Sequence, residues 1–134
     1  MPPVTWTDHR EGVILYRLAE DGALAAHTGD ANEFCVQLPP GIVSADFTLT
    51  WSDPRPLLLE FQSDNARYSN WEDDPVQAFM VTSPSSLHVE APRAGVWQIW
   101  IGPPVADGAR VWSLDISWTA IAGTTTEEVP DVDC

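Results

Sequence analysis

Large apolar residues alternate with polar ones in several short runs of this chain. In residues 111–118 the apolar positions are Trp112, Leu114, Ile116 and Trp118, and polar residues separate them. The same period of two recurs in five other runs, namely 34–38, 45–51, 57–61, 87–89 and 97–101. Such alternation is typical of β-strands that bury one face and expose the other.

Turn-forming residues separate these runs, and residues 76–82 are expected to form a further strand. The turns contain proline or glycine and lie at 39–41, 53–56, 83–84, 94–95 and 102–108. Short strands at this spacing, about seven or eight in all, predict an all-β protein. The expected fold is a single jelly-roll-like antiparallel β-sandwich with extended N- and C-terminal segments.

The segment 11–26 allows two interpretations. Ile14 and Leu18 lie four residues apart, as on one face of a helix, and alanines follow them. Two glycines disfavour a helix, and the β-branched and aromatic residues of 13–16 favour a strand. A first strand over 13–18, followed by a loop, is therefore the preferred prediction.

Three parts can be distinguished along the 134 residues, which suffice for one domain. Residues 1–11 are polar and contain prolines, and we expect them to form an N-terminal arm. Residues 12–119 carry nearly all of the apolar periodicity and form the predicted β-sandwich domain. Residues 120–134 are polar and acidic, and we expect this tail to be extended or disordered, or to be ordered only against a partner.

The formal net charge of −14 limits what the protein can bind. Twenty acidic residues stand against six basic ones, and all six are arginine. A surface of this sign repels phosphate polyanions and anionic lipids, so neither a nucleic acid nor a membrane is an expected partner. Two explanations of the composition stay open. One is adaptation to concentrated salt, in which carboxylates hold water and cations, and the other is a high-GC genome that favours arginine over lysine.

The two ends of the chain bear on its location. The N-terminus lacks a basic segment followed by an apolar run and a cleavage site, so export by an ordinary signal peptide is not expected. A role outside the cell stays open through another route, such as incorporation into a virus particle.

The sequence contains two cysteines. Cys35 lies in a predicted strand and Cys134 is the last residue. Two unpaired thiols are the preferred interpretation of so distant a pair, with a disulfide as the alternative.

One polar region is rich in the oxygen ligands that hard cations bind. Its candidate metal-binding residues are Asp64, Asn65, Glu72, Asp73 and Asp74. Calcium requires several such oxygens to converge, and no spacing of the EF-hand type is present. Calcium is therefore a candidate ligand, and a solvated acidic loop is the preferred interpretation.

The sequence contains no recognisable set of reactive residues. His9, His27 and His88 are scattered, and no serine lies in a Gly-x-Ser-x-Gly motif. There is no zinc-ligand spacing and no glycine-rich phosphate loop. We therefore expect a protein that is not an enzyme, has no catalytic residues and requires no cofactor.

The seven tryptophans fall into two groups. Four occupy the apolar side of alternating strands and are expected in the core, namely Trp51, Trp97, Trp112 and Trp118. Three do not fit that register and are candidate binding or interface residues, namely Trp6, Trp71 and Trp100. Exposed tryptophans are enriched at interfaces, so we expect these three to stack on sugar rings or insert into a neighbouring subunit. For Trp100, cover by the arm or by a second layer is an equal alternative.

Three stretches of the sequence resemble one known family. EFCVQLPPGIVSADFTLTW (33–51), PLLLEFQSDN (56–65) and AGVWQIWIGPPVADGARVWSLDISW (94–118) resemble successive strands of the bacterial or archaeal pre-peptidase C-terminal domain. The resemblance implies a β-sandwich without catalytic activity, which in that family accompanies secreted enzymes and surface proteins and aids folding, adhesion or carbohydrate contact. Residues 57–59 are leucines where the family carries aspartates that can bind calcium, so the resemblance does not transfer a calcium site.

These observations predict a non-enzymatic protein with a structural and adhesive role. The first hypothesis is a virion surface protein of a haloarchaeal tailed virus or high-GC phage, serving as a head decoration, turret or tail-associated module. Such a protein contacts neighbouring protein subunits, as a homo-oligomer or on a capsid, or binds a host receptor. The alternative is a stand-alone carbohydrate-binding or cell-surface adhesion module that recognises a glycan.

Overall fold

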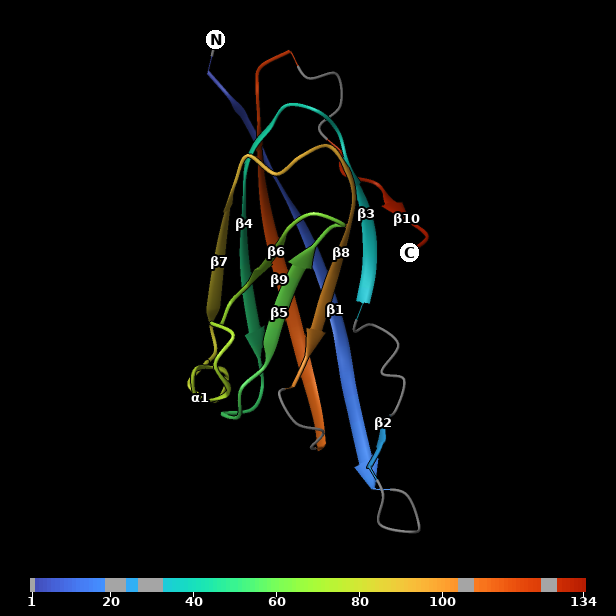
Figure 1. Ribbon diagram of the computed structural model, residues 1–134, viewed down its shortest axis with the longest axis vertical. Coiled ribbons are helices and arrows are strands. Elements are labelled where there is room, and N and C mark those ends of the chain that lie inside the picture. Colours follow the sequence, from blue (N-terminus) through green and yellow to red (C-terminus); the bar gives the residue numbers. More distant parts are fainter. Residues whose placement is uncertain (1, 19–23, 27–32, 104–107, 124–127) are drawn as a thin grey trace.

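The computed structural model describes residues 2–18, 24–26, 33–103, 108–123 and 128–134 of the chain. These residues form two antiparallel β-sheets of five strands each, with one short helix, α1 (Pro75–Ala78), in the described part. The strands run along the long axis of the molecule, and α1 lies at one end of it (Figure 1). The predicted all-β antiparallel sandwich is confirmed.

The two sheets are the layers of a jelly roll. Sheet A has the order β2 (Leu24–Ala26), β1 (Val4–Leu18), β9 (Gly108–Ala120), β4 (Ile42–Trp51) and β7 (Ser85–Glu90). Sheet B has the order β10 (Asp131–Val132), β3 (Glu33–Leu38), β8 (Gly95–Gly102), β5 (Leu58–Gln62) and β6 (Arg67–Ser69). Without the edge strands β2 and β10, the first, eighth, third and sixth strands form sheet A, and the second, seventh, fourth and fifth form sheet B. This is the strand order of a jelly roll.

The core lies between the sheets and consists of the inward positions of the alternating strands. All four tryptophans expected there are buried, namely Trp51, Trp97, Trp112 and Trp118. The ring of Phe61 in β5 stacks on Trp97 of β8 at a centroid distance of 4.3 Å, and Phe47 of β4 lies 4.9 Å from Phe61. These rings join sheet A to sheet B. Aromatic pairs of this kind add about 0.5–1.5 kcal/mol to the free energy gained by burial.

The first strand is longer than the sequence indicated. Residues 4–11, expected as an arm, form the first part of β1 and pair with β9, beginning with Val4 opposite Ala120. The preferred strand over 13–18 is confirmed as the second part of β1, and the short β2 lies in the segment expected as a loop. Pairing with β9 satisfies the backbone N–H and C=O groups of residues 4–11 along the edge of that strand. The polar composition of residues 4–11 does not indicate that β9 is their partner.

The predicted strand over 76–82 is wrong. Pro75–Ala78 form α1 instead, and no strand follows before β7. Asp74 causes the difference, because its carboxylate accepts a hydrogen bond from Val76 N at 2.9 Å and caps the helix. Proline also suits the first helical position, where its missing N–H costs no hydrogen bond.

The interpretation of two unpaired thiols is also wrong. Cys35 and Cys134 form a disulfide with their Cα atoms 5.2 Å apart. The sequence separation of 99 residues concealed this contact, which arises because β10 pairs with β3 and places Val132 opposite Cys35. Closing a loop of this length removes denatured-chain entropy worth about 4–5 kcal/mol. Residues 128–134, the described end of the predicted tail, are therefore attached to sheet B (Figure 1).

Candidate binding site

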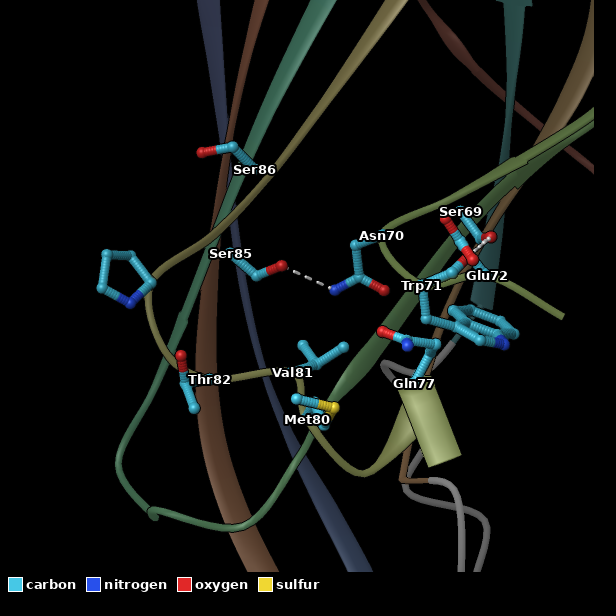
Figure 2. Close-up of a pocket in the computed structure, with 11 residues that line it drawn as sticks. Ser69, Asn70, Trp71, Glu72, Gln77, Met80, Val81, Thr82, Ser85 and Ser86 are labelled. Carbon is cyan, nitrogen blue, oxygen red and sulfur yellow. Dashed lines mark hydrogen bonds between the residues drawn. The ribbon is translucent and has the colours of Figure 1, made fainter. Parts of the chain in front are cut away.

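A groove lies at the end of the sandwich that carries α1 (Figure 2). Its volume is about 510 Å³. The lining residues come from the end of β6 and the segment after it, from α1 and the loop that follows it, and from the start of β7: Ser69, Asn70, Trp71, Glu72, Gln77, Met80, Val81, Thr82, Pro84, Ser85 and Ser86. We refer to it as the loop groove. Amides and hydroxyls supply polar groups beside one indole ring, a combination that suits a polar ligand with apolar faces.

Asn70 fixes one side of the loop groove. Its Nδ2 donates to Ser85 Oγ at 2.9 Å (Figure 2). Its Oδ1 accepts a hydrogen bond from Leu59 N at 2.9 Å, and its Nδ2 also donates to Leu57 O at 3.3 Å. The amide therefore joins β5 of sheet B to the start of β7 in sheet A. Because its oxygen and its nitrogen both have protein partners, we assign Asn70 a positioning role.

Trp71 forms a wall of the loop groove and is held by Arg67. The guanidinium lies over the indole, with Arg67 Cζ 5.2 Å from the ring centroid. Arg67 forms ion pairs with Asp73, at 2.7 Å, and with Glu60. Hydrogen bonds to these carboxylates raise the pKa of Arg67 above its usual value, and the bond to Asp73 has the larger effect. The charged guanidinium therefore holds the indole by a cation–π contact.

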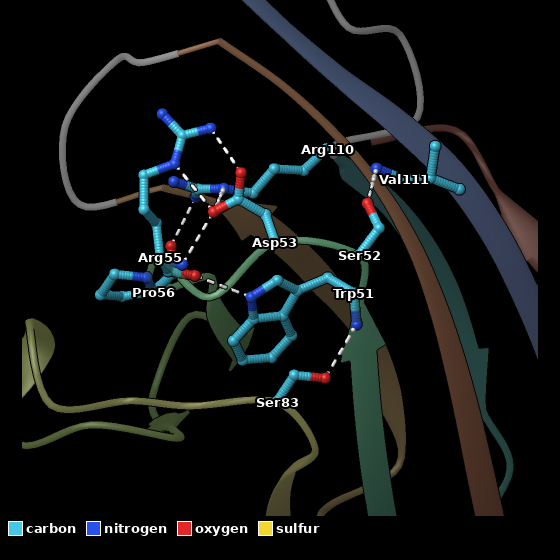
Figure 3. A network of polar contacts seen from close by, with 8 residues as sticks. All are labelled: Trp51, Ser52, Asp53, Arg55, Pro56, Ser83, Arg110 and Val111. Atoms are coloured by element: carbon cyan, nitrogen blue, oxygen red, sulfur yellow. Dashed lines mark hydrogen bonds and ion pairs between the residues drawn. The ribbon is translucent and has the colours of Figure 1, made fainter.

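A polar network supports the loop that follows β4 at the same end of the sandwich (Figure 3). The indole nitrogen of Trp51 donates to Arg55 O at 2.7 Å. The backbone nitrogen of Trp51 donates to Ser83 Oγ at 3.0 Å, which ties β4 to the segment that lines the loop groove. The end of a core strand therefore positions two loops at once.

Arg110 of β9 is the buried charged member of this network. Its guanidinium donates to Pro56 O and lies 4.0 Å from the carboxylate of Asp53 (Figure 3). Hydrogen bonds from the side chain and the backbone of Arg55 hold the pKa of Asp53 well below its usual range. Asp53 therefore stays ionised and faces the buried guanidinium, which gives the loop a fixed conformation.

An exposed apolar cluster lies beside the loop groove. Val76 and Phe79 are 64% and 55% exposed, and Met80 is 66% exposed. These three residues, which we name the loop cluster, belong to α1 or follow it directly. Phe79 also lines a hollow of about 290 Å³ together with Trp71 and Leu58. Large apolar side chains exposed together mark a surface that gains free energy when a partner covers it.

The structure places the three candidate tryptophans in different environments. Trp6 lies in β1, which begins at the end opposite α1, and packs half-buried against the core (Figure 1). Trp100 lies on β8, where its ring covers Gly102 so closely that a Cβ at that position would overlap the indole. Gly102 pairs with Leu58, which shares a hollow with Trp71. The fold thus brings Trp100 and Trp71 to the same region of sheet B and keeps Trp6 elsewhere.

The acidic candidates are divided by β6. The residues at 64–65 precede this strand, and those at 72–74 follow it. Asp73 pairs with Arg67, and Asp74 caps α1, so both have structural contacts. Within the described ranges, no three His, Cys, Asp or Glu side chains converge as metal ligands. Calcium binding stays a prediction.

Two histidine–carboxylate clusters lie on the outer face of sheet A, and sequence reasoning missed both. In the first cluster, His9 Nδ1 lies 2.7 Å from Asp115 Oδ1, and His9 Nε2 lies 2.9 Å from Glu11 Oε1. Asp115 comes from β9, opposite His9 in the register of β1 and β9. The sequence signal was limited to the His-x-Glu spacing, because the aspartate is supplied by a strand distant in the chain.

The second cluster repeats this arrangement at the other side of the sheet. His88 of β7 contacts Asp46 of β4 through Nδ1 and Glu90 through Nε2. A carboxylate only accepts hydrogen bonds, so both contacts of such an imidazole are hydrogen bonds only when the ring is doubly protonated. Hydrogen bonds to the aspartate and then to the glutamate raise the pKa of His88, and the first cluster raises the pKa of His9 in the same way. The remaining histidine, His27, lies outside the described residues.

Comparison of the sequence with models of protein families and with curated proteins finds no match. None of the helices in the described residues has the length and the apolar character needed to cross a membrane. The role of the protein is therefore inferred from its fold and from the surfaces at its loop end.

Proposed function

We propose that this protein is a non-enzymatic structural and adhesive component of a virion surface, which contacts neighbouring subunits or a host receptor through the loop cluster. The observation that carries the proposal is the exposure of Val76, Phe79 and Met80, each by more than half, on a well-supported end of the sandwich. Burial of apolar surface against a partner yields about 25 cal/mol per Å². The polar network behind these loops limits the entropy that binding costs.

Two further features support a role on a surface. The jelly-roll fold recurs in viral capsid and lectin domains, whose binding loops extend from a rigid sandwich. The disulfide between Cys35 and Cys134 suits an oxidising setting such as the surface of a virion or a cell. Fold alone does not define function, so the contact assigned to the loop cluster is the part that requires a test.

The test compares the assembly of the wild type with that of F79S/M80S. We expect the wild type to sediment as a defined oligomer in analytical ultracentrifugation, or to co-sediment with purified virus particles, and the double variant to do neither. V96S is the matched control, because Val96 is 50% exposed near the start of β8, and only the far end of that strand, at Gly102, pairs with the region beside Phe79. The control should behave as the wild type. A wild type that stays monomeric and ignores the particles contradicts the proposal, as does a double variant that assembles normally.

A second candidate function is carbohydrate binding, which the composition of the loop groove favours. Trp71 offers an indole on which the C–H face of a sugar ring can stack, and Gln77 and Ser86 offer groups for its hydroxyls. In this case the protein recognises a surface glycan as a monomer. The same residues would then bind a small polar ligand in place of an apolar protein surface.

Tryptophan fluorescence distinguishes this second candidate. Cellohexaose and chitohexaose are suitable soluble probes, and a sugar-binding groove predicts saturable quenching in the wild type that is lost in W71A. W100A is the matched control, because Trp100 covers Gly102 and does not line the loop groove. Absence of quenching with both probes rejects this candidate, and equal loss in W100A rejects the groove as its site.

A further inference from the structure

The C-terminal strand β10 covers the edge of sheet B that β3 forms. Val132 lies opposite Cys35 in an antiparallel ladder, and Gln37 N donates to Pro130 O at 2.9 Å. Only two residues of β10 belong to the ladder. An edge strand without such cover presents unpaired N–H and C=O groups that accept another strand. The tail therefore occupies a strand-accepting edge through a short backbone contact.

Side chains of the tail have specific binding sites near the same edge. Val129 is buried and belongs to the hydrophobic core cluster, although it lies after the last long strand. Arg10 of β1 forms a two-point ion pair with Asp131, with Arg10 Nη1 2.7 Å from Asp131 Oδ2. The guanidinium also lies 5.1 Å from the ring centroid of Phe34 in β3. The core thus binds the side chain of Val129, and Arg10 binds that of Asp131. These two tail residues are two positions apart, which is the spacing of side chains on one face of a strand.

The length of chain between β9 and the tail sets how far the tail can reach. Ten residues separate Ala120, the end of β9, from Asp131. A chain of that length spans up to about 33 Å when extended. The disulfide at Cys134, the ion pair of Asp131 and the burial of Val129 together tie the tail to its own molecule.

We propose that the edge of β3 is an interaction surface for a second copy of this chain, whose residues 128–134 replace the molecule's own tail. In the exchanged form, Val129 and Asp131 of one protomer bind the core site and Arg10 of the next, and Cys134 of the donor bonds to Cys35 of the acceptor. The inference rests on the proposed function, in which neighbouring subunits are partners, and it names that neighbour. β-Strand addition of this kind obtains affinity from the backbone and specificity from alternate side chains.

The exchanged form arises from the reduced chain, before the Cys35–Cys134 bond of one molecule has formed, and the covalent step is ordinary thiol–disulfide exchange with a low-molecular-weight disulfide such as oxidised glutathione. The thiolate of Cys134 attacks one glutathione sulfur, forms a mixed disulfide and releases one glutathione thiolate. The thiolate of Cys35 in the acceptor then attacks the Cys134 sulfur and releases the second glutathione thiolate. Two protein thiols are oxidised to one disulfide, and one glutathione disulfide is reduced to two thiols.

Two full-length variants test the exchange directly. C35S retains Cys134 and can only donate its tail, whereas C134S retains Cys35 and can only accept one. We expect the mixture to form a disulfide-linked heterodimer in a glutathione redox buffer, and mass spectrometry should identify a peptide that joins Cys134 to Cys35. Circular dichroism establishes that both variants are folded. Should C35S fail to fold, the peptide EVPDVDC, which is residues 128–134, replaces it as the donor.

V129D makes the test directional. Placed in the donor, C35S/V129D should lower the yield of the heterodimer by about tenfold or more, because the tail loses its buried apolar anchor. Placed in the acceptor, C134S/V129D should leave the yield unchanged or raise it, because the acceptor's own tail no longer competes. An equal effect in both positions, or no heterodimer at all, overturns the inference.

These outcomes are separable from the test of the proposed function. Strand exchange fails if the Cys134–Cys35 heterodimer is absent while F79S/M80S still abolishes assembly, and the surface role then stands. Assembly through the loop cluster fails if F79S/M80S assembles as the wild type does, whatever the two cysteine variants form.

Discussion

The face that a residue occupies decides what its side chain does, and the tryptophans show this directly. Trp97 is buried between the sheets and stacks on Phe61. Trp100, three residues later on the same strand, lies over the backbone of Gly102. Alternation along β8 was sufficient to predict that Trp97 is in the core. The close packing of Trp100 on Gly102 depends on the rotamer of the indole, which no sequence pattern encodes.

We predict different stability losses for these two tryptophans. W97A removes a buried indole and should lower the free energy of unfolding by about 3–5 kcal/mol. W100A removes an indole from the outer side of the strand and should cost clearly less. Urea denaturation monitored by circular dichroism measures both. Equal losses would mean that Trp100 is as much a core residue as Trp97.

The histidine clusters predict a stability that depends on pH. Asp115 and Glu11 raise the folded-state pKa of His9 above its unfolded value of about 6.5, and Asp46 and Glu90 do the same for His88. A raised folded pKa stabilises the fold fully below the unfolded value, and this contribution is lost as the pH rises through the folded value. The free energy of unfolding of the wild type should therefore decrease as the pH rises from about 6 through the raised pKa values of the two histidines in the folded state.

H9Q/H88Q is the variant that isolates this effect. Its stability should decline less than that of the wild type over the same pH range, because glutamine does not titrate. Thermal unfolding measures the decline, and NMR titration of the imidazole resonances measures each pKa. Imidazole pKa values at or below about 6.5 would contradict the doubly bonded imidazolium.

At the scale of elements, local signals and long-range contacts contribute differently. The period-two runs predicted strands that became β3, β4, β5, β7, β8 and β9. The prediction of a strand at 76–82 was wrong because the side chain of Asp74 caps α1 and lowers the free energy of a helical turn there. β6 and β10 are too short to show a periodicity, and each exists because a neighbouring strand offers its edge. Elements of two or three residues are therefore decided by tertiary pairing.

Arg110 provides a prediction for the loop between β4 and β5. R110M removes the buried donor to Pro56 O and the cation that faces Asp53, so it should lower the free energy of unfolding by about 1.5–3 kcal/mol. R93M is the matched control, because the side chain of Arg93 is exposed and its backbone carbonyl still accepts from Trp97 Nε1. Urea denaturation of both variants provides the measurement. A loss of similar size in R93M would indicate a general effect of charge.

At the scale of the whole molecule, the net charge of −14 is a property that no single contact explains. Carboxylates on one small domain repel one another when salt does not screen them. The jelly roll keeps its strands together through the core and the disulfide, and the acidic surface opposes that cohesion. This balance makes the stability of the entire fold a function of ionic strength.

The salt-adapted interpretation of the charge predicts a lower melting temperature in dilute buffer. Dialysis from molar potassium chloride should lower Tm by about 4 °C or more, a shift that corresponds to roughly 1 kcal/mol in a domain of this size. Differential scanning calorimetry measures the change, and sucrose in place of salt controls for effects that do not depend on charge. A melting temperature that does not change on dialysis would favour the genomic explanation of the missing lysines.

The sequence by itself determined the fold class, the inward faces of the main strands and the four core tryptophans, because alternation and residue size act within a few neighbouring positions. Only the tertiary structure decided the pairing of residues 4–11 with β9, the Cys35–Cys134 bond, the two histidine clusters and the loop groove. The first three bring together residues distant in the chain through strand register and strand order, and the loop groove depends on how residues 69–86 fold between the two sheets. Their formation depends on which edges the packed core leaves free to pair, and no short window of sequence contains that information.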